Sequence, residues 1–244
     1  MRFETFVAAR YLRSKRKNRF VSLITIISVA GVSVGVIALI VVMSVMTGFD
    51  IALRATIIGN RAHLTIVQRG GRQIEDVKGV IDQIESLCPE VIASGPVIQV
   101  QGLLLFHGNT EGAFIVGVDP EQEQHVTDLA ENLTTHDGRS FGRGSLPGEK
   151  EIVLGYQLAR RLGANIGSEI TAVTAKDRVK PLQGMRNWSQ IWLRVSGISH
   201  AKMSDFDTLY AFVDMPTARM LTGRPGSDAI HVKLTDPFLA DKVA

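Results

Sequence analysis

The sequence predicts an α+β protein in which an N-terminal transmembrane helix precedes a two-lobed, mixed α+β periplasmic domain. Three observations lead to this fold class. Residues 20–49 contain no Asp, Glu, Lys or Arg, and residues 1–19 are strongly basic. Beyond residue 50, short stretches with the two-residue period of strands alternate with amphipathic helical segments.

The apolar segment 20–49 is long enough to stay in a membrane as a helix. A bilayer core needs roughly 20 apolar residues, whereas the apolar part of a signal peptide has about 7–15 and ends at small residues. The segment here ends in "VMTGF", which offers no such cleavage site. We therefore expect a retained transmembrane helix, continuing to Ile58 and ending at the helix-breaking pair Gly59–Asn60.

The charges beside this helix predict its orientation. Residues 1–19 carry seven Lys or Arg against Glu4 alone, and such an excess marks the cytoplasmic side. Within this segment the apolar spacing of Phe3, Phe6 and Val7 indicates a short basic elbow helix along the inner interface. The large domain, 50–244, then lies in the periplasm of a bacterial inner membrane protein.

The overall composition excludes nucleic-acid binding. The chain has 27 basic and 24 acidic residues, but its basic excess lies entirely in the first 49, so the outer domain is mildly acidic. Cys88 is the single cysteine and cannot form a disulfide within the chain, which suits a bacterial envelope protein stabilised by its core. We interpret Cys88 as a small buried hydrophobe.

The outer domain is predicted element by element from the period of its apolar residues. Strands are expected over 62–68, 96–106, 113–118, 150–155, 168–175, 188–198, 208–214 and 229–234. Helices are expected over 75–87, near 120–132, over 156–164 and 216–222, and from 236 onward. A turn over 107–112 and polar stretches over 133–148 and 176–187 connect them. The loose middle, 119–213, is predicted to be a lobe inserted into a first lobe made of 50–118 and 214–244. Because the sequence stops within a predicted helix, we expect it to be the front part of a longer protein.

Enzymatic motifs fail on their context. "GRSFG" (138–142) fits G-x-S-x-G, with His136 and Asp137 beside Ser140, but a nucleophile elbow needs a strand before the serine and a helix after it. Both flanks here resemble loops. "GSLPGEK" breaks the spacing of a phosphate-binding loop, so any ATP chemistry belongs to another chain. The histidines show no ligand spacing, and no metal site is predicted.

Small and flexible residues divide the membrane helix into two candidate contact regions. Ser28, Gly31, Gly35 and Ala38 form a small-residue stripe that favours packing against further helices, and the alternative is a lone anchor with incidental glycines. Nearer the outer end, Met43, Met46 and Phe49 suit irregular apolar partners such as acyl chains. Ordinary contact with the bilayer explains these three equally well.

The polar stretch near 176–190 is a candidate docking loop. It combines basic and apolar side chains, namely Lys180, Pro181, Met185, Arg186 and Trp188, with Trp192 at its edge. The alternative is a solvated hairpin whose two tryptophans fold into the core.

The N-terminal segment "ARYLRSKRKNRFVSLITIISVAGVSVGVIALIVVMSVMTGFD" resembles the opening of the LolC/LolE family, the permease subunits of the lipoprotein-releasing ABC transporter. The segments "GVDPEQEQ" (117–124) and "EIVLGYQLARRLGANIGSEI" (151–170) also resemble that family, and the similarity covers most of the chain. "GVDPEQEQ" and "AIHVKLTDPFLADKV" favour the LolE type. The matching positions in the opening are Phe20, Ser22, Ile24, Ile27, Ser28, Gly31, Gly35, Val36, Met46, Gly48 and Phe49.

The resemblance implies four membrane helices with a MacB-like domain between the first two, and a transport subunit without catalysis. ATP and Mg would bind a partner LolD-like ATPase dimer, and this chain would bind no cofactor. With a second LolC/LolE-like permease it would extract lipoproteins from the outer leaflet and pass them to a LolA-like carrier. The acyl cavity would include Val42, Met43, Met46 and Phe49. In the LolC type a Pro-rich loop matching 175–190 catches the carrier, whereas this sequence has Pro181 alone; the LolE type would contact the lipoprotein there.

Two other functions fit parts of the sequence. A MacB- or FtsX-type permease would transmit ATPase motion to a periplasmic partner. A single-pass anchored periplasmic enzyme or sensor would need no further membrane helices. Three more apolar segments of about 20 residues downstream would distinguish a permease from an anchor.

Overall fold

The computed structural model describes residues 19–134, 143–175 and 188–240, together with Phe3, Phe6, Val7 and Arg10. It divides into two compact units, Met1–Leu53 and Arg54–Ala244. A long apolar helix and a mixed β-rich domain confirm the predicted α+β class. The predicted basic elbow over 1–19 lies mostly outside the described residues, although the four described there before residue 19 are helical.

Helix α2 (Arg19–Gly59) contains the predicted membrane segment. Its portion Ser22–Leu53 is, in the described part of the chain, the one helix long and apolar enough to cross a membrane. The helix ends at Gly59, as the sequence predicts.

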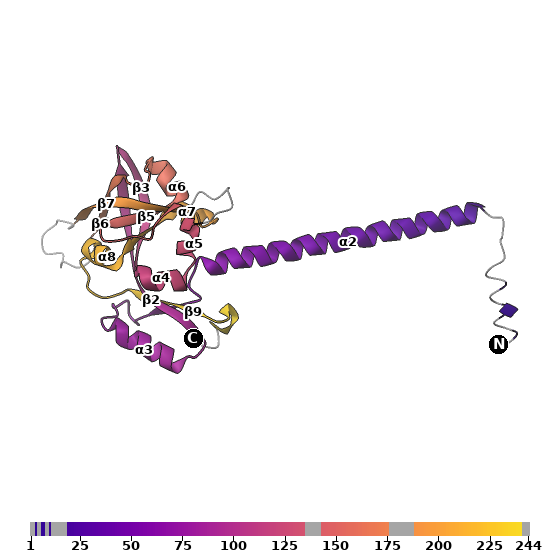
Figure 1. The fold of residues 1–244 in the computed structure, drawn as a ribbon, viewed down its shortest axis with the longest axis horizontal. Coiled ribbons are helices and arrows are strands. Elements are labelled where there is room, and N and C mark those ends of the chain that lie inside the picture. The colour runs from indigo at the N-terminus through magenta and orange to yellow at the C-terminus, as the bar shows by residue number, and fades with distance from the viewer. Residues whose placement is uncertain are drawn as a thin grey trace. The chain divides into compact units, whose positions relative to one another are not determined.

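The second unit is built around one sheet (Figure 1). Its strands are β1 (Leu64–Val67), β2 (Val91–Phe106), β3 (Asn109–Val118), β4 (Arg143–Gly144), β5 (Glu151–Gly155), β6 (Glu169–Ala175), β7 (Trp188–Ser199), β8 (Tyr210–Asp214) and β9 (Ala229–Leu234). Its helices are α3 (Val77–Leu87), α4 (Pro120–Val126), α5 (Leu129–Thr134), α6 (Tyr156–Leu162), α7 (Ser204–Leu209), α8 (Met215–Thr222) and the 3₁₀ turn η1 (Pro237–Leu239).

Six of the strands close into a barrel. β2 pairs with β3, β3 with β8, β8 with β5, β5 with β7, β7 with β6, and β6 returns to β2. The main core fills this ring and is completed by Leu158 and Leu162 from α6 and by Ala218 and Leu221 from α8. Helix α8 packs so closely that a Cβ at Gly117 would collide with the Ala218 Cβ, which explains the glycine.

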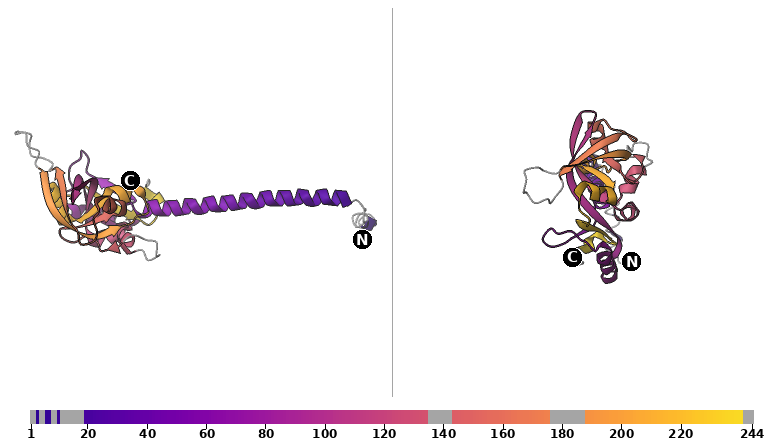
Figure 2. Two further views of the ribbon diagram at one scale, coloured as in Figure 1. Left: turned by 90° about the horizontal axis from the view of Figure 1, so that it is seen from above. Right: turned by 90° about the vertical axis from the view of Figure 1, so that its left-hand side faces the viewer.

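The first part of β2 belongs to a second, smaller layer. Val91–Val97 pair with β9, which pairs with β1, and α3 covers these strands through Val77, Val80 and Ile81 (Figure 2). β2 is therefore shared between the small layer and the barrel, and it holds the two parts of the unit together.

Several predicted elements differ in detail. The predicted turn over 107–112 is only two residues, His107 and Gly108, both with positive φ as hairpin turns require, so β3 begins at Asn109. The predicted helix near 120–132 is two helices broken at Thr127, whose backbone is extended. Helix α7 and strand β4 were not predicted, and the expected strand 208–214 begins at Tyr210.

Two further predictions concern burial and lobes. Cys88 caps the C-terminus of α3 and is only half-buried, so its interpretation as a buried hydrophobe was wrong. The small hydrophobic cluster under α3 includes Ile84 and Val91 on either side of this cap but not Cys88 itself. The division into an inserted lobe 119–213 and a lobe of 50–118 plus 214–244 stays a prediction.

Candidate functional site

The predicted acyl-contact residues all lie on α2. Val42, Met43, Met46 and Phe49 are 67%, 63%, 65% and 59% exposed. Val42, Met46 and Phe49 are spaced four and three apart, so they share one helix face. This face is apolar and uncovered in the described structure.

The predicted packing stripe lies nearer the start of the same helix. At Gly31 and Gly35, apart from the adjoining residues and backbone of the helix itself, no described atom lies within 4 Å of the point where a Cβ would stand. Ser28 and Ala38 are also exposed. The stripe is open, as a surface for further helices would be before they bind.

The candidate docking loop is described only at its edge. Lys180, Pro181, Met185 and Arg186 lie outside the described residues, as do Ser140, His136 and Asp137. Trp188 and Trp192 lie on β7 and are 54% and 65% exposed. The interpretation that these tryptophans fold into the core was therefore wrong.

Both tryptophans belong to an uncharged outer face of the barrel, which we call the tryptophan face. Three rows of side chains cross its strands β7, β6, β2 and β3. None of these positions carries Asp, Glu, Lys or Arg. Two rows are Trp192–Thr171–Leu105–Thr110 and Gln190–Val173–Leu103–Gly112, and the third consists of the pairs Trp188–Ala175 and Gln101–Phe114, which line one surface hollow.

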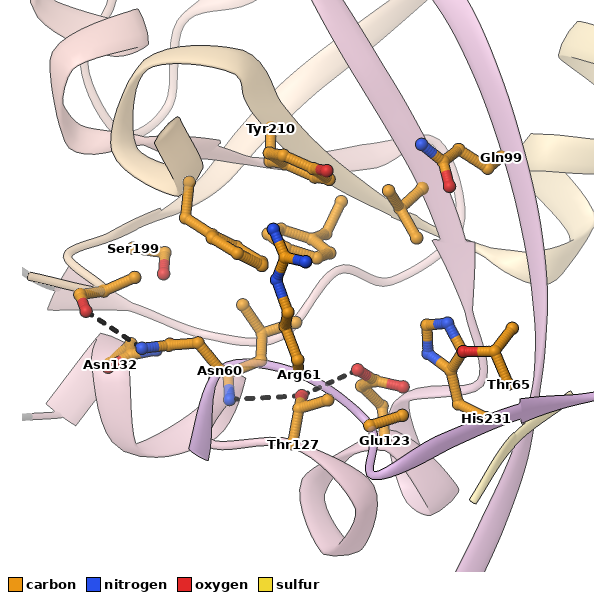
Figure 3. A pocket seen from close by; sticks show the side chains of 16 residues that line it. Asn60, Arg61, Thr65, Gln99, Glu123, Thr127, Asn132, Ser199, Tyr210 and His231 are labelled. Atoms are coloured by element: carbon orange, nitrogen blue, oxygen red, sulfur yellow. Dashed lines mark hydrogen bonds between the residues drawn. The ribbon is translucent and has the colours of Figure 1, made fainter. Parts of the chain in front are cut away.

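A second candidate site is a pocket of about 280 Å³ on another part of the outer domain (Figure 3). Its walls come from segments far apart in the sequence and mix aromatic, amide and charged side chains. We call it the Arg61–Glu123 pocket. Its lining residues are Asn60, Arg61, Ala62, Thr65, Gln99, Val116, Glu123, Thr127, Leu129, Asn132, Ser199, Ala201, Phe206, Tyr210, Phe212 and His231.

The register of the sheet builds part of this pocket. Val116 on β3 lies between Gln99 on β2 and Phe212 on β8. On the neighbouring layer Thr65 of β1 pairs with His231 of β9. Because alternate residues of a strand face the same side, these positions present a mixed polar and aromatic surface to α4 and α5.

Asn60 and Arg61, the first residues after α2, contact residues that line this pocket. The Asn60 amide donates to the Ala201 carbonyl at 3.0 Å, and the Asn132 amide donates to the Asn60 side-chain oxygen at 2.7 Å. The Arg61 guanidinium lies over the Phe206 ring, 5.6 Å from its centroid, and Phe206 stacks on Tyr210. Such a cation–π contact stabilises the orientation of Arg61.

Glu123 is the most deeply buried charged side chain of the pocket. It is 3% exposed and accepts a hydrogen bond from the Thr127 hydroxyl at 2.7 Å. Burial raises the pKa of Glu123 to about 7, against a smaller lowering by the Thr127 bond. The same hydroxyl accepts the Leu129 N–H, which explains why the chain breaks between α4 and α5 at Thr127.

His231 completes the polar end of the pocket. Burial lowers the pKa of His231, so its neutral form is favoured. Its Nδ1 is buried and has no hydrogen-bond partner among the described residues. Glu123, His231 and Thr65 lie together at one side of the pocket, whereas the Arg61 side chain extends towards Tyr210 (Figure 3).

This arrangement can bind a small ligand. In the part of the chain that the structure describes, no group of three or more His, Cys, Asp or Glu side chains is placed to hold a metal ion. A buried carboxyl with a shifted pKa in a cavity is a common mark of a binding site. The sequence prediction missed it, although Glu123 stands three residues before the buried Val126, on the apolar side of a short helix.

Comparison with known proteins gives a consistent result. Residues 25–244 match the family described as MacB-like periplasmic core domain. The chain is 30% identical over 96% of its length to the lipoprotein-releasing system transmembrane protein LolC of Neisseria meningitidis, covering 55% of that protein. It is 24% identical over 96% of its length to LolE of Haemophilus influenzae, covering 56% of that protein.

Among solved structures, the extracellular domain of the ABC-type transporter YknZ from Gram-positive bacteria is similar at a TM-score of 0.45 and 11% identity. The match covers 73% of this chain and 86% of that one. The chain spans about half the length of the curated relatives it matches. The predicted preference for the LolE type is not reflected in the identities, which are higher for the LolC relative.

Proposed function

Because the chain belongs to the MacB-like periplasmic core domain family, among its LolC/LolE-type members, we propose that it is the front part of an ABC transporter permease. The permease extracts lipoproteins from the outer leaflet of the bacterial inner membrane and passes them to a periplasmic carrier. It does no catalysis itself. ATP and Mg bind a LolD-like ATPase dimer on the cytoplasmic side, and a second LolC/LolE-like permease completes the complex.

The length of the apolar part of α2 is the observation that best supports this proposal. Ser22–Leu53 has 32 residues, about 48 Å of helix at a rise of 1.5 Å per residue. A bilayer core of about 30 Å covers roughly 20 of them. Tilting of the helix can accommodate some of the remaining apolar residues. We propose that the others contact an apolar ligand.

The outer end of this helix is where we place that ligand. Val42, Met46 and Phe49 form one exposed apolar face, with Met43 beside it. Methionine adapts its shape to irregular apolar partners, and a lipoprotein presents flexible acyl chains. The open stripe of Gly31 and Gly35 would then pack against the other membrane helices of the complex.

The tryptophan face and the adjoining loop are the proposed contact for carrier or cargo protein. Trp188 and Trp192 are exposed on an uncharged surface, and large exposed apolar side chains mark protein interaction sites. Lys180, Pro181, Met185 and Arg186 belong to the same proposed contact by sequence.

The acyl-contact assignment is tested in the full-length protein reconstituted with its ATPase and second permease. We expect the double variant Met46→Lys, Phe49→Lys to lose lipoprotein release while it still co-purifies with the ATPase. The matched control is Ser44→Lys, Ile51→Lys, which places the same charges at similar depth on the opposite helix face. Normal release by the first variant, or equal loss in both, would contradict the assignment.

A further inference from the structure

Two charges of opposite sign line the Arg61–Glu123 pocket without neutralising each other. In the described part of the chain Arg61 and Glu123 form no ion pair, and Figure 3 shows the Arg61 side chain directed away from Glu123, towards Tyr210. Glu123 is buried, which opposes its ionisation, whereas Arg61 is exposed, so the pocket offers an acidic and a basic group that do not pair with each other.

The Glu123 end of the pocket lacks a cation. The carboxyl accepts one hydrogen bond from Thr127, and it is surrounded by the neutral side chains of Thr65 and His231. An ionised carboxylate can accept about four hydrogen bonds, so acceptor capacity remains. An ammonium group supplies both the missing charge and the missing donors.

The Arg61 end lacks an anion. The guanidinium carbon lies 5.6 Å from the centroid of the Phe206 ring, a contact that uses none of its N–H donors. A guanidinium is suited to bidentate contact with a phosphate or carboxylate. The amide of Gln99, on the same side of the pocket as Tyr210, adds polar lining there.

Size limits the ligand to a small group. About 280 Å³ is just below the range typical of ligand pockets. The rings of Phe206, Tyr210 and Phe212 line the pocket together with Val116 and Leu129, so a short alkyl linker between two charged ends would contact apolar atoms.

We propose that the Arg61–Glu123 pocket binds a small zwitterion, with its ammonium group at Glu123 and its phosphate at Arg61. Phosphoethanolamine has this chemistry, either free in solution or as a phospholipid headgroup. The proposal goes beyond the transport function and does not depend on which cargo the permease carries.

The pocket also predicts how binding depends on pH. An ammonium ligand binds the ionised form of Glu123, and a carboxyl with a pKa of about 7 becomes ionised between pH 6 and pH 8. The other titratable lining groups are Arg61, Tyr210 and His231. Of the elements packed against α4, β9 contributes His231, whereas β2 and α5 contribute only uncharged lining residues. Affinity for the zwitterion should therefore rise with pH across this range.

Calorimetric titration of the full chain in detergent with free phosphoethanolamine tests the site. Binding should be saturable, stronger at pH 8 than at pH 6, and about tenfold weaker or more in Glu123→Gln and in Arg61→Gln, each of which loses a charge-assisted bond. The matched controls keep wild-type affinity. They are Glu121→Gln, which is exposed on the same helix, and Arg160→Gln, whose guanidinium lies over Tyr156 outside the pocket.

A second arm identifies the source of the ligand. The chain is reconstituted into phosphatidylglycerol vesicles with and without phosphatidylethanolamine, and hydrogen exchange of residues 120–132 is compared. Protection that depends on phosphatidylethanolamine and is lost in Glu123→Gln assigns a headgroup. Binding of the free compound without that dependence assigns a soluble zwitterion. Wild-type chain that shows neither, while retaining its circular dichroism, overturns the proposal. Loss of lipoprotein release by the α2 variants would not affect either result.

Discussion

The Arg61–Glu123 pocket buries a polar side chain, whereas the tryptophan face exposes apolar ones. The pocket encloses a carboxyl that is only 3% exposed, whereas the face displays Trp192 at 65% exposure. Both surfaces lie on the outer side of the same sheet and share the strands β2 and β3. Folding alone favours neither arrangement, because burying a polar carboxyl and exposing aromatic area both oppose stability.

The contrast teaches what kind of partner each surface fits. A buried carboxyl gains from a ligand that brings charge and donors into a closed space. A flat uncharged face gains from losing water over a wide apolar contact, as the centre of a protein interface does. On the two proposals above, the domain would recognise a small charged group at one surface and contact a larger apolar surface at the other.

The largest expected effect concerns the buried carboxyl. In the folded chain the pKa of Glu123 is about 7, raised above its ordinary value of 4.5. The stability that depends on keeping Glu123 neutral is therefore fully present below pH 4.5. This contribution is lost as the pH rises through 7, and it amounts to about 3 kcal/mol. Between pH 5 and pH 8, the free energy of unfolding of the wild-type chain should therefore fall by up to about 3 kcal/mol more than that of Glu123→Gln. Urea titrations at the two pH values measure this difference.

Glu121→Gln is the control for this titration. Glu121 is exposed on the same helix, so its replacement should keep the wild-type pH dependence. If Glu123→Gln showed the same loss between pH 5 and pH 8 as the wild type, the carboxyl would be ionised in the folded protein throughout.

Some parts of the fold could be predicted from the sequence and others could not. Strand and helix positions were predictable because the apolar period is local, and the end of α2 at Gly59 follows from the pair Gly59–Asn60. Closure of the barrel was not predictable. It depends on β6 pairing with both β2 and β7, and the sequences of these distant segments do not show which residues pair.

The pocket could not be predicted for the same physical reason. Its walls combine Asn60, Glu123, Phe206 and His231, which only the folded topology brings together. The tryptophan face was closer to prediction, since Trp188 and Trp192 lie four residues apart on one strand. This even spacing places both side chains on one side of the strand but cannot say whether that side is covered.

A smaller effect on stability is expected from Asn60, in the wall of the pocket. Asn60→Ala removes the bond to the Ala201 carbonyl and the acceptor for the Asn132 amide, leaving part-buried groups unsatisfied. We expect a loss of about 2 kcal/mol in the free energy of unfolding. Gln124→Ala is the matched control, because that exposed amide bonds only to the Glu121 carbonyl within the same helix, and it should change stability little. Equal values for the two variants would mean that water replaces the Asn60 bonds at no cost.

The smallest expected effect is on the tryptophan face. Trp192→Ala should change the free energy of unfolding by no more than about 0.5 kcal/mol, since a side chain that is 65% exposed contributes little packing. Its neighbour Leu193 points into the barrel core and is 1% exposed, so Leu193→Ala should cost about 3 kcal/mol. Urea titration of both variants in detergent measures the difference. A large loss from Trp192→Ala would show that the ring is packed within the chain, and the face would then no longer be a free surface for a partner.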